Sequence, residues 1–264
     1  MIPNTARVWN YVAGGKDNYK VDELAGEVLR DTAPQITTMA RESRLYRSRA
    51  VTLLASKGIT QFLDIGTGLP TGDNTHEVAQ RVAPDARIVY VDNDPNVVNH
   101  AQNLSVSTRA GHVAAVNADL HDPDAILAAA RDHLDLSQPV ALMLMGVMGH
   151  IEDHADATAI VRRLLAGLSP GSYFVHYDCT DTSVDLVKAQ DNYNRINGVL
   201  PYILRSPDEI ASYYEGLELL APGIVSCPLW RPDLNPKPDP ADPDHAPDSP
   251  PQYTDIHGGV ARQA

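Results

Sequence analysis

From residue 59 onward, the chain alternates between short apolar runs and longer segments with helical spacing of apolar positions. The apolar runs predict buried strands at residues 61–65, 87–92, 112–119, 139–145 and 172–178. The segments between them predict amphipathic helices at residues 75–82, 95–104, 123–134 and 153–168. This alternation is typical of βαβ units, so we expect an α/β fold with a parallel sheet covered by helices on both faces.

The regions on either side of this alternation have a different pattern. Residues 5–15, 21–31 and 42–58 indicate helices, so we expect residues 1–58 to form a helical cap on a core of residues 59–230. Residues 231–251 are rich in Pro and Asp, which excludes a helix or a central strand and predicts an extended surface loop. Residues 217–230 and 252–264 would pair as the last two strands across this loop, within a single domain of residues 1–264.

The composition excludes several classes of function. Lys and Arg number 21 against 34 Asp and Glu, a formal charge of -13 without a basic stretch, so we do not expect nucleic acid as a partner. The N-terminus lacks the apolar region of a secretory signal, and no run of about eighteen apolar residues is present to span a membrane. Two cysteines, Cys179 and Cys227, fit a reducing compartment, so we expect a cytoplasmic protein.

Acidic residues and glycines gather at the predicted carboxyl ends of the strands, the edge where open parallel sheets bind ligands. The first strand leads into Asp64, Gly66 and Gly68. Asp92 ends the second strand, where a carboxylate accepts hydrogen bonds from the ribose hydroxyls of a nucleotide. Asp119 ends the third strand and would either reach an adenine amino group or act as a loop or capping acid, a role for which Asp122 competes.

The glycine turn discriminates between two nucleotide-like ligands. The dinucleotide fingerprint G-x-G-x-x-G requires a third glycine where this chain has Thr71. Asp64, just before the first glycine, would repel a pyrophosphate, whereas it suits the ammonium group at the methionine end of S-adenosylmethionine. The charge argument favours the second ligand and leaves a nicotinamide-dependent oxidoreductase as the less favoured alternative.

Several longer segments are familiar: "PNTARVWNYVAGGKDNY", "FLDIGTGLPT", "NTHEVAQRVAPDARIVYVDNDP" and "HGGVAR". Together they resemble the S-adenosyl methyltransferase family that is common in actinomycetes and was long catalogued as a domain of unknown function. The resemblance runs from Asn4 to Arg262. It implies a Rossmann-like class I methyltransferase fold with a seven-stranded, mostly parallel sheet whose last strand is antiparallel.

The resemblance also implies a donor site for S-adenosylmethionine, which leaves as S-adenosylhomocysteine. On the family pattern, Asp64, Gly66 and Gly68 form the first motif, Asp92 the second and Asp119 the third. We include as donor contacts the adjoining or strand-terminal residues Thr67, Asn93, Leu120 and Met145. The family does not settle the methyl acceptor, which we expect to be a small molecule. A protein that binds the donor as a sensor, without transfer, remains an alternative.

Two further segments carry candidate chemistry. "AGGKDNY" fails the phosphate-loop pattern, so it is either a helix end with a turn or a lid in which Lys16, Asn18 or Tyr19 faces the ligand. The resemblance favours the lid, and we include Tyr19 among the donor contacts.

His150, in "HIEDH" after the fourth strand, titrates near neutral pH and is the candidate base that deprotonates the acceptor; the alternative is a structural histidine. The spacing to His154 does not match a zinc site, so no metal is expected. Asp178, at the end of the fifth strand, is the residue of that strand expected to reach a substrate.

Overall fold

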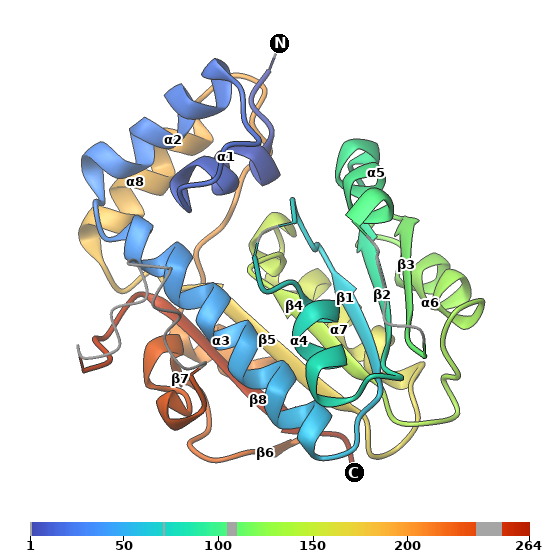
Figure 1. Cartoon of the computed structure of the whole chain (residues 1–264). Helices are drawn as coiled ribbons and strands as arrows, with labels where there is room; N and C mark the ends of the chain where they lie inside the picture. The colour runs from blue at the N-terminus through green and yellow to red at the C-terminus, as the bar shows by residue number, and fades with distance from the viewer. Residues whose placement is uncertain (1, 71, 105–109, 236–249) are drawn as a thin grey trace.

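A single mixed sheet forms the centre of the molecule, which we describe from a computed structural model covering residues 2–70, 72–104, 110–235 and 250–264 (Figure 1). Its first five strands are parallel: β1 (Gln61–Ile65), β2 (Arg87–Asp92), β3 (His112–Asn117), β4 (Ala141–Met145) and β5 (Tyr173–Cys179). They lie in the order β3-β2-β1-β4-β5, followed by the antiparallel β8 (Ile256–Arg262). The α/β class, the mostly parallel sheet and the antiparallel last strand are therefore confirmed.

The outer edge of the sheet differs in detail from the expected pair of final strands. In place of one strand within residues 217–230, two short strands pair with β8: β6 (Glu218–Leu219) and β7 (Val225–Ser226). The turn at Pro222 and Gly223 separates them, since Pro has no N–H to donate to a strand partner. The described part of the sheet therefore has eight strands, with β6 and β7 sharing the position of the expected seventh.

Helices cover both faces of the sheet. On one face lie α3 (Ile36–Ser56), α4 (Thr75–Val82) and α5 (Pro95–Leu104), and on the other α6 (Pro123–Arg131), α7 (His154–Ala166) and α9 (Pro207–Ser212). Successive residues of β1 supply the two apolar layers: Phe62 packs into the first and Leu63 into the second. Burial on both faces explains why these strands read as continuous apolar runs.

The helical cap is assembled from two distant parts of the chain. The helices α1 (Thr5–Val12) and α2 (Lys20–Thr32) pack together, and α8 (Val184–Asn194) lies against α2 (Figure 1). The helix expected from residue 42 begins at Ile36, and this α3 runs along the sheet beside α4. No helix in the described ranges combines the length and the apolar character needed to cross a bilayer.

The end of the chain is described in part. A short 3-10 turn at Pro232–Leu234 opens the Pro/Asp-rich region, and β8 follows it. Most of the loop expected at residues 231–251 lies outside the described residues.

Candidate functional site

The glycine turn after β1 is held between the ends of β2 and β4. Gly66 and Gly68 have positive φ angles of 71° and 64°, a region that glycine enters without strain. The Gly66 N–H donates to the Val91 carbonyl over 2.8 Å, and a Cβ at Gly66 would overlap the side chain of Val147. Both the backbone angle and the close approach therefore require glycine at position 66.

Asp92 closes this turn from the end of β2. Its Oδ2 accepts from the Gly68 N–H over 3.0 Å, and its Oδ1 accepts from the Asp94 N–H over 3.0 Å. Burial raises the pKa of Asp92, and these backbone hydrogen bonds oppose that shift. Each carboxylate oxygen keeps a further lone pair, so the group is fixed in place and still able to accept two hydroxyl donors.

Asp64 lies under the turn and is only 3% exposed. Its Oδ2 accepts from the Thr75 hydroxyl over 2.6 Å, which ties the end of β1 to the start of α4. Burial raises the pKa of Asp64, while the Thr75 hydrogen bond and the positive charge of Arg47 oppose the rise. The helix itself begins with a capping box formed by Asn74 and Glu77.

The loops after β2 and β3 bring Asn93 and Asp119 together. Asn93 Nδ2 donates to Asp119 Oδ2 over 3.2 Å, and Asp119 Oδ1 accepts from the His121 N–H over 2.8 Å. That backbone hydrogen bond is the main reason why the pKa of Asp119 lies below its usual value. Asp122 caps α6, so the exposed Asp119 is not the capping acid, and the buried Leu120 lies between the two.

Two hollows lie on opposite edges of the sheet. A small one at the glycine turn is lined by Thr67, Gly68, Pro70, Asn74, His76, Tyr90 and Ala101. A larger open hollow of about 690 Å³ lies at the amino ends of β1 and β2, between Arg87 and residues 131–137. The smaller one marks the candidate site, because ligands of open parallel sheets bind at the carboxyl ends of the strands.

His150 lies beyond β4, in the 3-10 turn Met148–His150. Its Nδ1 lies 2.8 Å from the Pro201 carbonyl, which can only accept, so Nδ1 carries the proton and Nε2 presents a lone pair. Burial lowers the pKa of His150, so the ring is neutral at pH 7. The Tyr202 ring packs edge-on against it, with ring centroids 5.1 Å apart. His154 contacts the Ser212 hydroxyl through its Nε2.

The expected substrate contact of Asp178 is wrong. Asp178 is fully buried: its Oδ1 accepts from the Tyr202 hydroxyl over 2.7 Å, and its Oδ2 lies 3.0 Å from His176 Nε2. The segment after α8 crosses the end of β5, where the Arg205 N–H donates to the Cys179 carbonyl. This crossing covers Asp178. The Asp178 carboxylate binds the Tyr202 hydroxyl, and the Tyr202 ring in turn packs against the His150 ring.

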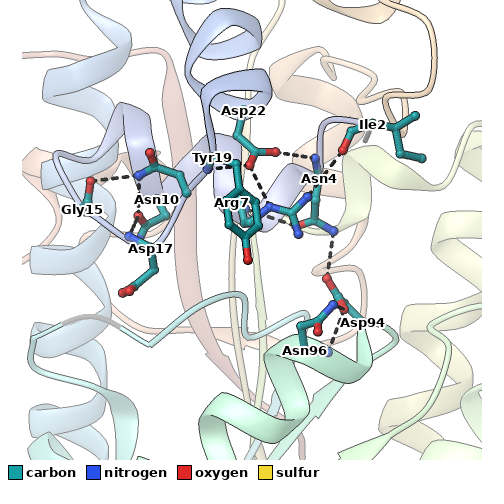
Figure 2. Close-up of polar contacts among 11 residues, drawn as sticks. Ile2, Asn4, Arg7, Asn10, Gly15, Asp17, Tyr19, Asp22, Asp94 and Asn96 are labelled. Atoms are coloured by element: carbon teal, nitrogen blue, oxygen red, sulfur yellow. Dashed lines mark hydrogen bonds and ion pairs between the residues drawn. The ribbon is translucent and has the colours of Figure 1, made fainter.

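The "AGGKDNY" segment forms the turn that ends α1 and begins α2. Asn10 Oδ1 accepts from the Asp17 N–H and from Asn18 Nδ2, each over 3.0 Å. The Gly15 N–H donates to the Asn10 carbonyl over 2.8 Å, and a Cβ at Gly15 would overlap the Asn10 side chain (Figure 2). The helix end with a turn is therefore present, and Lys16, Asp17 and Tyr19 are exposed in it, Tyr19 at 56%.

Tyr19 is held by a buried acid at the start of α2. Asp22, at 0% exposure, accepts from the backbone N–H groups of Asn4 and Tyr19, each over 2.9 Å, and from Arg7 Nε over 2.7 Å. The Arg7 guanidinium lies 5.1 Å from the centroid of the Tyr19 ring. Figure 2 shows the Tyr19 side chain pointing from the cap toward the core.

A side-chain hydrogen bond from Asn4 joins this part of the cap to the loop after β2. Asn4 Nδ2 donates to Asp94 Oδ2 over 2.8 Å, and Asp94 Oδ1 accepts from the Asn96 N–H at the start of α5 (Figure 2). Asp94 also donates its N–H to Asp92. The cap is thus connected, through Asp94, to Asp92 at the end of β2.

Two arginines on α3 were not singled out from the sequence. Arg44 Nη1 approaches the Ala13 carbonyl at 3.4 Å, and Arg47 Nη2 donates to the Asp73 carbonyl over 3.1 Å. Both therefore reach segments that border the glycine turn and the cap. The available signal was their spacing of three residues, which places them side by side on a helix. Met145, at the end of β4, lies half-buried against the layer of the sheet that α3 covers.

Comparisons with known proteins place the chain. The profile of the family described as S-adenosyl methyltransferase matches residues 1–264. A DUF574 family protein from Streptomyces avermitilis is 41% identical, with a TM-score of 0.88 over 100% of this chain and 98% of that one. A candidate methyltransferase from Thermobifida fusca is 37% identical, with a TM-score of 0.84 over 99% of this chain and 95% of that one.

More distant similarity is restricted to the fold. The mitomycin 7-O-methyltransferase MmcR is 13% identical, with a TM-score of 0.52 over 98% of this chain and 68% of that one. A search of curated proteins returns no match. The family profile covers the whole chain, and the two relatives above 30% identity cover nearly all of it. The chain belongs to the S-adenosyl methyltransferase family.

Proposed function

We propose that this methyltransferase transfers a methyl group to a small-molecule acceptor, with S-adenosylmethionine held over the carboxyl ends of β1 and β2. The observation that carries the proposal is the Asp92 carboxylate, fixed by the N–H groups of Gly68 and Asp94 with lone pairs left to accept the ribose hydroxyls. Family membership supports the identity of the donor.

The remaining donor contacts follow the edge of the sheet. Asn93, Asp119 and Leu120 would hold the adenine end, since their loops meet beside Asp92. Gly66, Thr67 and Gly68 would let the donor lie close to the backbone, and the negative charge of Asp64 beneath them would favour its ammonium group. Met145 from β4 and Tyr19 from the cap would border the same space.

His150 is the proposed acceptor base. S-adenosylmethionine supplies an activated methyl group on a sulfonium centre. The chain contributes the neutral imidazole, whose Nε2 lone pair takes the proton of an acceptor hydroxyl or N–H as the methyl group is accepted. The Pro201 carbonyl keeps the Nδ1 proton in place, so the base always presents the same nitrogen.

The setting follows from charge and cysteine use. The chain carries a net charge of -13, which favours a small molecule over nucleic acid as the acceptor. Its two cysteines are unpaired and buried, as fits the cytoplasm. We propose that residues 1–264 act as one domain, in which α1, α2 and α8 form the cap, whereas α3, expected in a cap of residues 1–58, packs with the core of residues 59–230.

Titration calorimetry tests the donor site. Wild-type protein is expected to bind S-adenosylmethionine and S-adenosylhomocysteine in the micromolar range, and Asp92→Ala is expected to weaken both by about 10- to 100-fold. Asp85→Ala, an exposed acid before β2 and away from the carboxyl edge, is the matched control and should change neither. Binding of NADH in place of these ligands would contradict the proposal, and tight donor binding without turnover on any acceptor would favour a sensor.

A further inference from the structure

We propose that Arg44 and Arg47 of α3 form a subsite that binds the carboxylate at the methionine end of the donor. The inference rests on the proposed function, because it places one end of the same ligand. It adds two residues that neither the glycine motif nor the strand-end acids include.

The position of the two side chains is the first argument. Arg44 and Arg47 are three residues apart and therefore neighbours on one face of α3. Arg44 reaches the Ala13 carbonyl, at the end of α1, and Arg47 reaches the Asp73 carbonyl, at the end of the glycine turn. The pair consequently lies between the cap and the turn, beside the proposed donor.

A comparison with the other arginines of α3 is the second argument. Arg41 is exposed and forms an ion pair with Glu42. Arg49 is fully buried and donates to the Cys227 carbonyl over 2.6 Å and to Asn235 Oδ1 over 2.5 Å. Arg49 thus has a structural role on the side of α3 that faces Cys227 and Asn235. Arg44 and Arg47, in contrast, face the carboxyl edge of the sheet.

The electrostatic setting of Arg44 is the third argument. Within the described ranges, Arg44 forms no ion pair, and its hydrogen bond to Ala13 is long at 3.4 Å. Burial lowers the pKa of the Arg44 guanidinium, and the like charge of Arg47 lowers it further. Two partly buried cations side by side are stabilised by an anion between them, and a planar guanidinium suits a carboxylate.

Asp64 indicates which carboxylate this is. Its Oδ2 accepts from the Thr75 hydroxyl, and Arg47 donates to the carbonyl of Asp73 two residues earlier, so the acid and the arginine border the same short segment. One acid beside two guanidinium groups complements an α-amino acid, which carries an ammonium and a carboxylate on the same carbon. The methionine end of the donor has both groups. An acceptor that carries a carboxylate would satisfy the arginines and leave Asp64 unmatched.

Calorimetry with three adenosine ligands separates the contributions. S-adenosylhomocysteine carries both groups, its decarboxylated analogue lacks only the carboxylate, and 5′-methylthioadenosine lacks the amino acid altogether. Wild type should bind the first about 10- to 100-fold more tightly than the decarboxylated analogue. Arg44→Gln should remove most of that preference and leave 5′-methylthioadenosine binding unchanged, Arg44→Lys should restore part of it, and Arg41→Gln should behave as wild type.

The outcomes distinguish the inference from the proposed function. If Arg44→Gln weakens all three ligands equally, or leaves the preference intact, the carboxylate subsite is wrong and the donor site stands. If wild type binds none of the three, both fail. A further arm adds benzoate to protein saturated with S-adenosylhomocysteine. Thermal stabilisation by benzoate that disappears in Arg44→Gln would assign the arginines to an acidic acceptor and overturn the donor assignment.

Discussion

Replacing Asp22 by Ala tests whether one buried acid holds the cap together. The Asp22 carboxylate is at 0% exposure and accepts from three donors: the Asn4 N–H, the Tyr19 N–H and Arg7 Nε. The substitution leaves these donors, one of them a cation, without their acceptor. Breaking a buried charge pair from one side costs about 3–5 kcal/mol.

The expected loss is measurable by thermal unfolding followed by circular dichroism. For a chain of this size, about 1 kcal/mol corresponds to roughly 2–4 °C, so Asp22→Ala should lower Tm by about 6–20 °C. Asp31→Ala, an exposed acid near the end of the same helix, is the matched control and should change the free energy of unfolding by no more than about 0.5 kcal/mol.

Donor binding supplies a second readout for the same variant. Asn4 and Tyr19 lose their shared anchor in Asp22→Ala, so S-adenosylhomocysteine binding should weaken at temperatures where the variant remains folded. A Tm within about 2 °C of wild type would refute the reasoning, because it would show that the three donors find equal partners without Asp22.

Two further predictions concern ionisable groups at the site. His150→Gln should lower kcat by about 10²- to 10⁴-fold, with S-adenosylhomocysteine binding unchanged by calorimetry. Because burial lowers the pKa of His150, the wild-type rate should stay level above pH 6.5 and fall only at lower pH, and the same inflection in His150→Gln would rule out His150 as the base. Asp64→Asn should leave or raise Tm at pH 7 while weakening donor binding. The reason is that the pKa of Asp64 is higher in the folded state than in the unfolded state. Its contribution to the free energy of unfolding is therefore full below the unfolded-state pKa and is lost as the pH rises through the folded-state pKa. A Tm lowered at pH 7 yet unchanged at pH 3 would contradict that sign.

Local patterns in the sequence were sufficient for the five parallel strands and for most helix starts. The continuous apolar runs reflect burial on both faces, and the capping residues act within one turn of the chain, as at Asn74 and Asp122. The alternation of strands and helices also predicts that Asp64, Asp92 and Asp119 lie along one edge of the sheet, at or just after the ends of three neighbouring strands. The approach of Asn93 to Asp119 is a direct consequence of two neighbouring parallel strands.

Features that depend on distant segments could not be read in this way. Asp178 ends a strand, yet the segment around Arg205 crosses over it, and no local pattern predicts that crossing. The packing of α8 against α2 joins parts of the chain more than a hundred residues apart. Arg44 and Arg47 were missed because a helix assigned to a cap was not expected to border the glycine turn. Their contacts become visible only when α3 is placed on the sheet.

A crystal structure of the protein with S-adenosylhomocysteine tests the central claim most directly. The account predicts the ribose hydroxyls within hydrogen-bonding distance of both Asp92 oxygens and the sulfur beside the turn at Gly66 and Gly68. Ligand bound in the larger hollow at the amino ends of β1 and β2, or at the carboxyl edge without contact to Asp92, would contradict it.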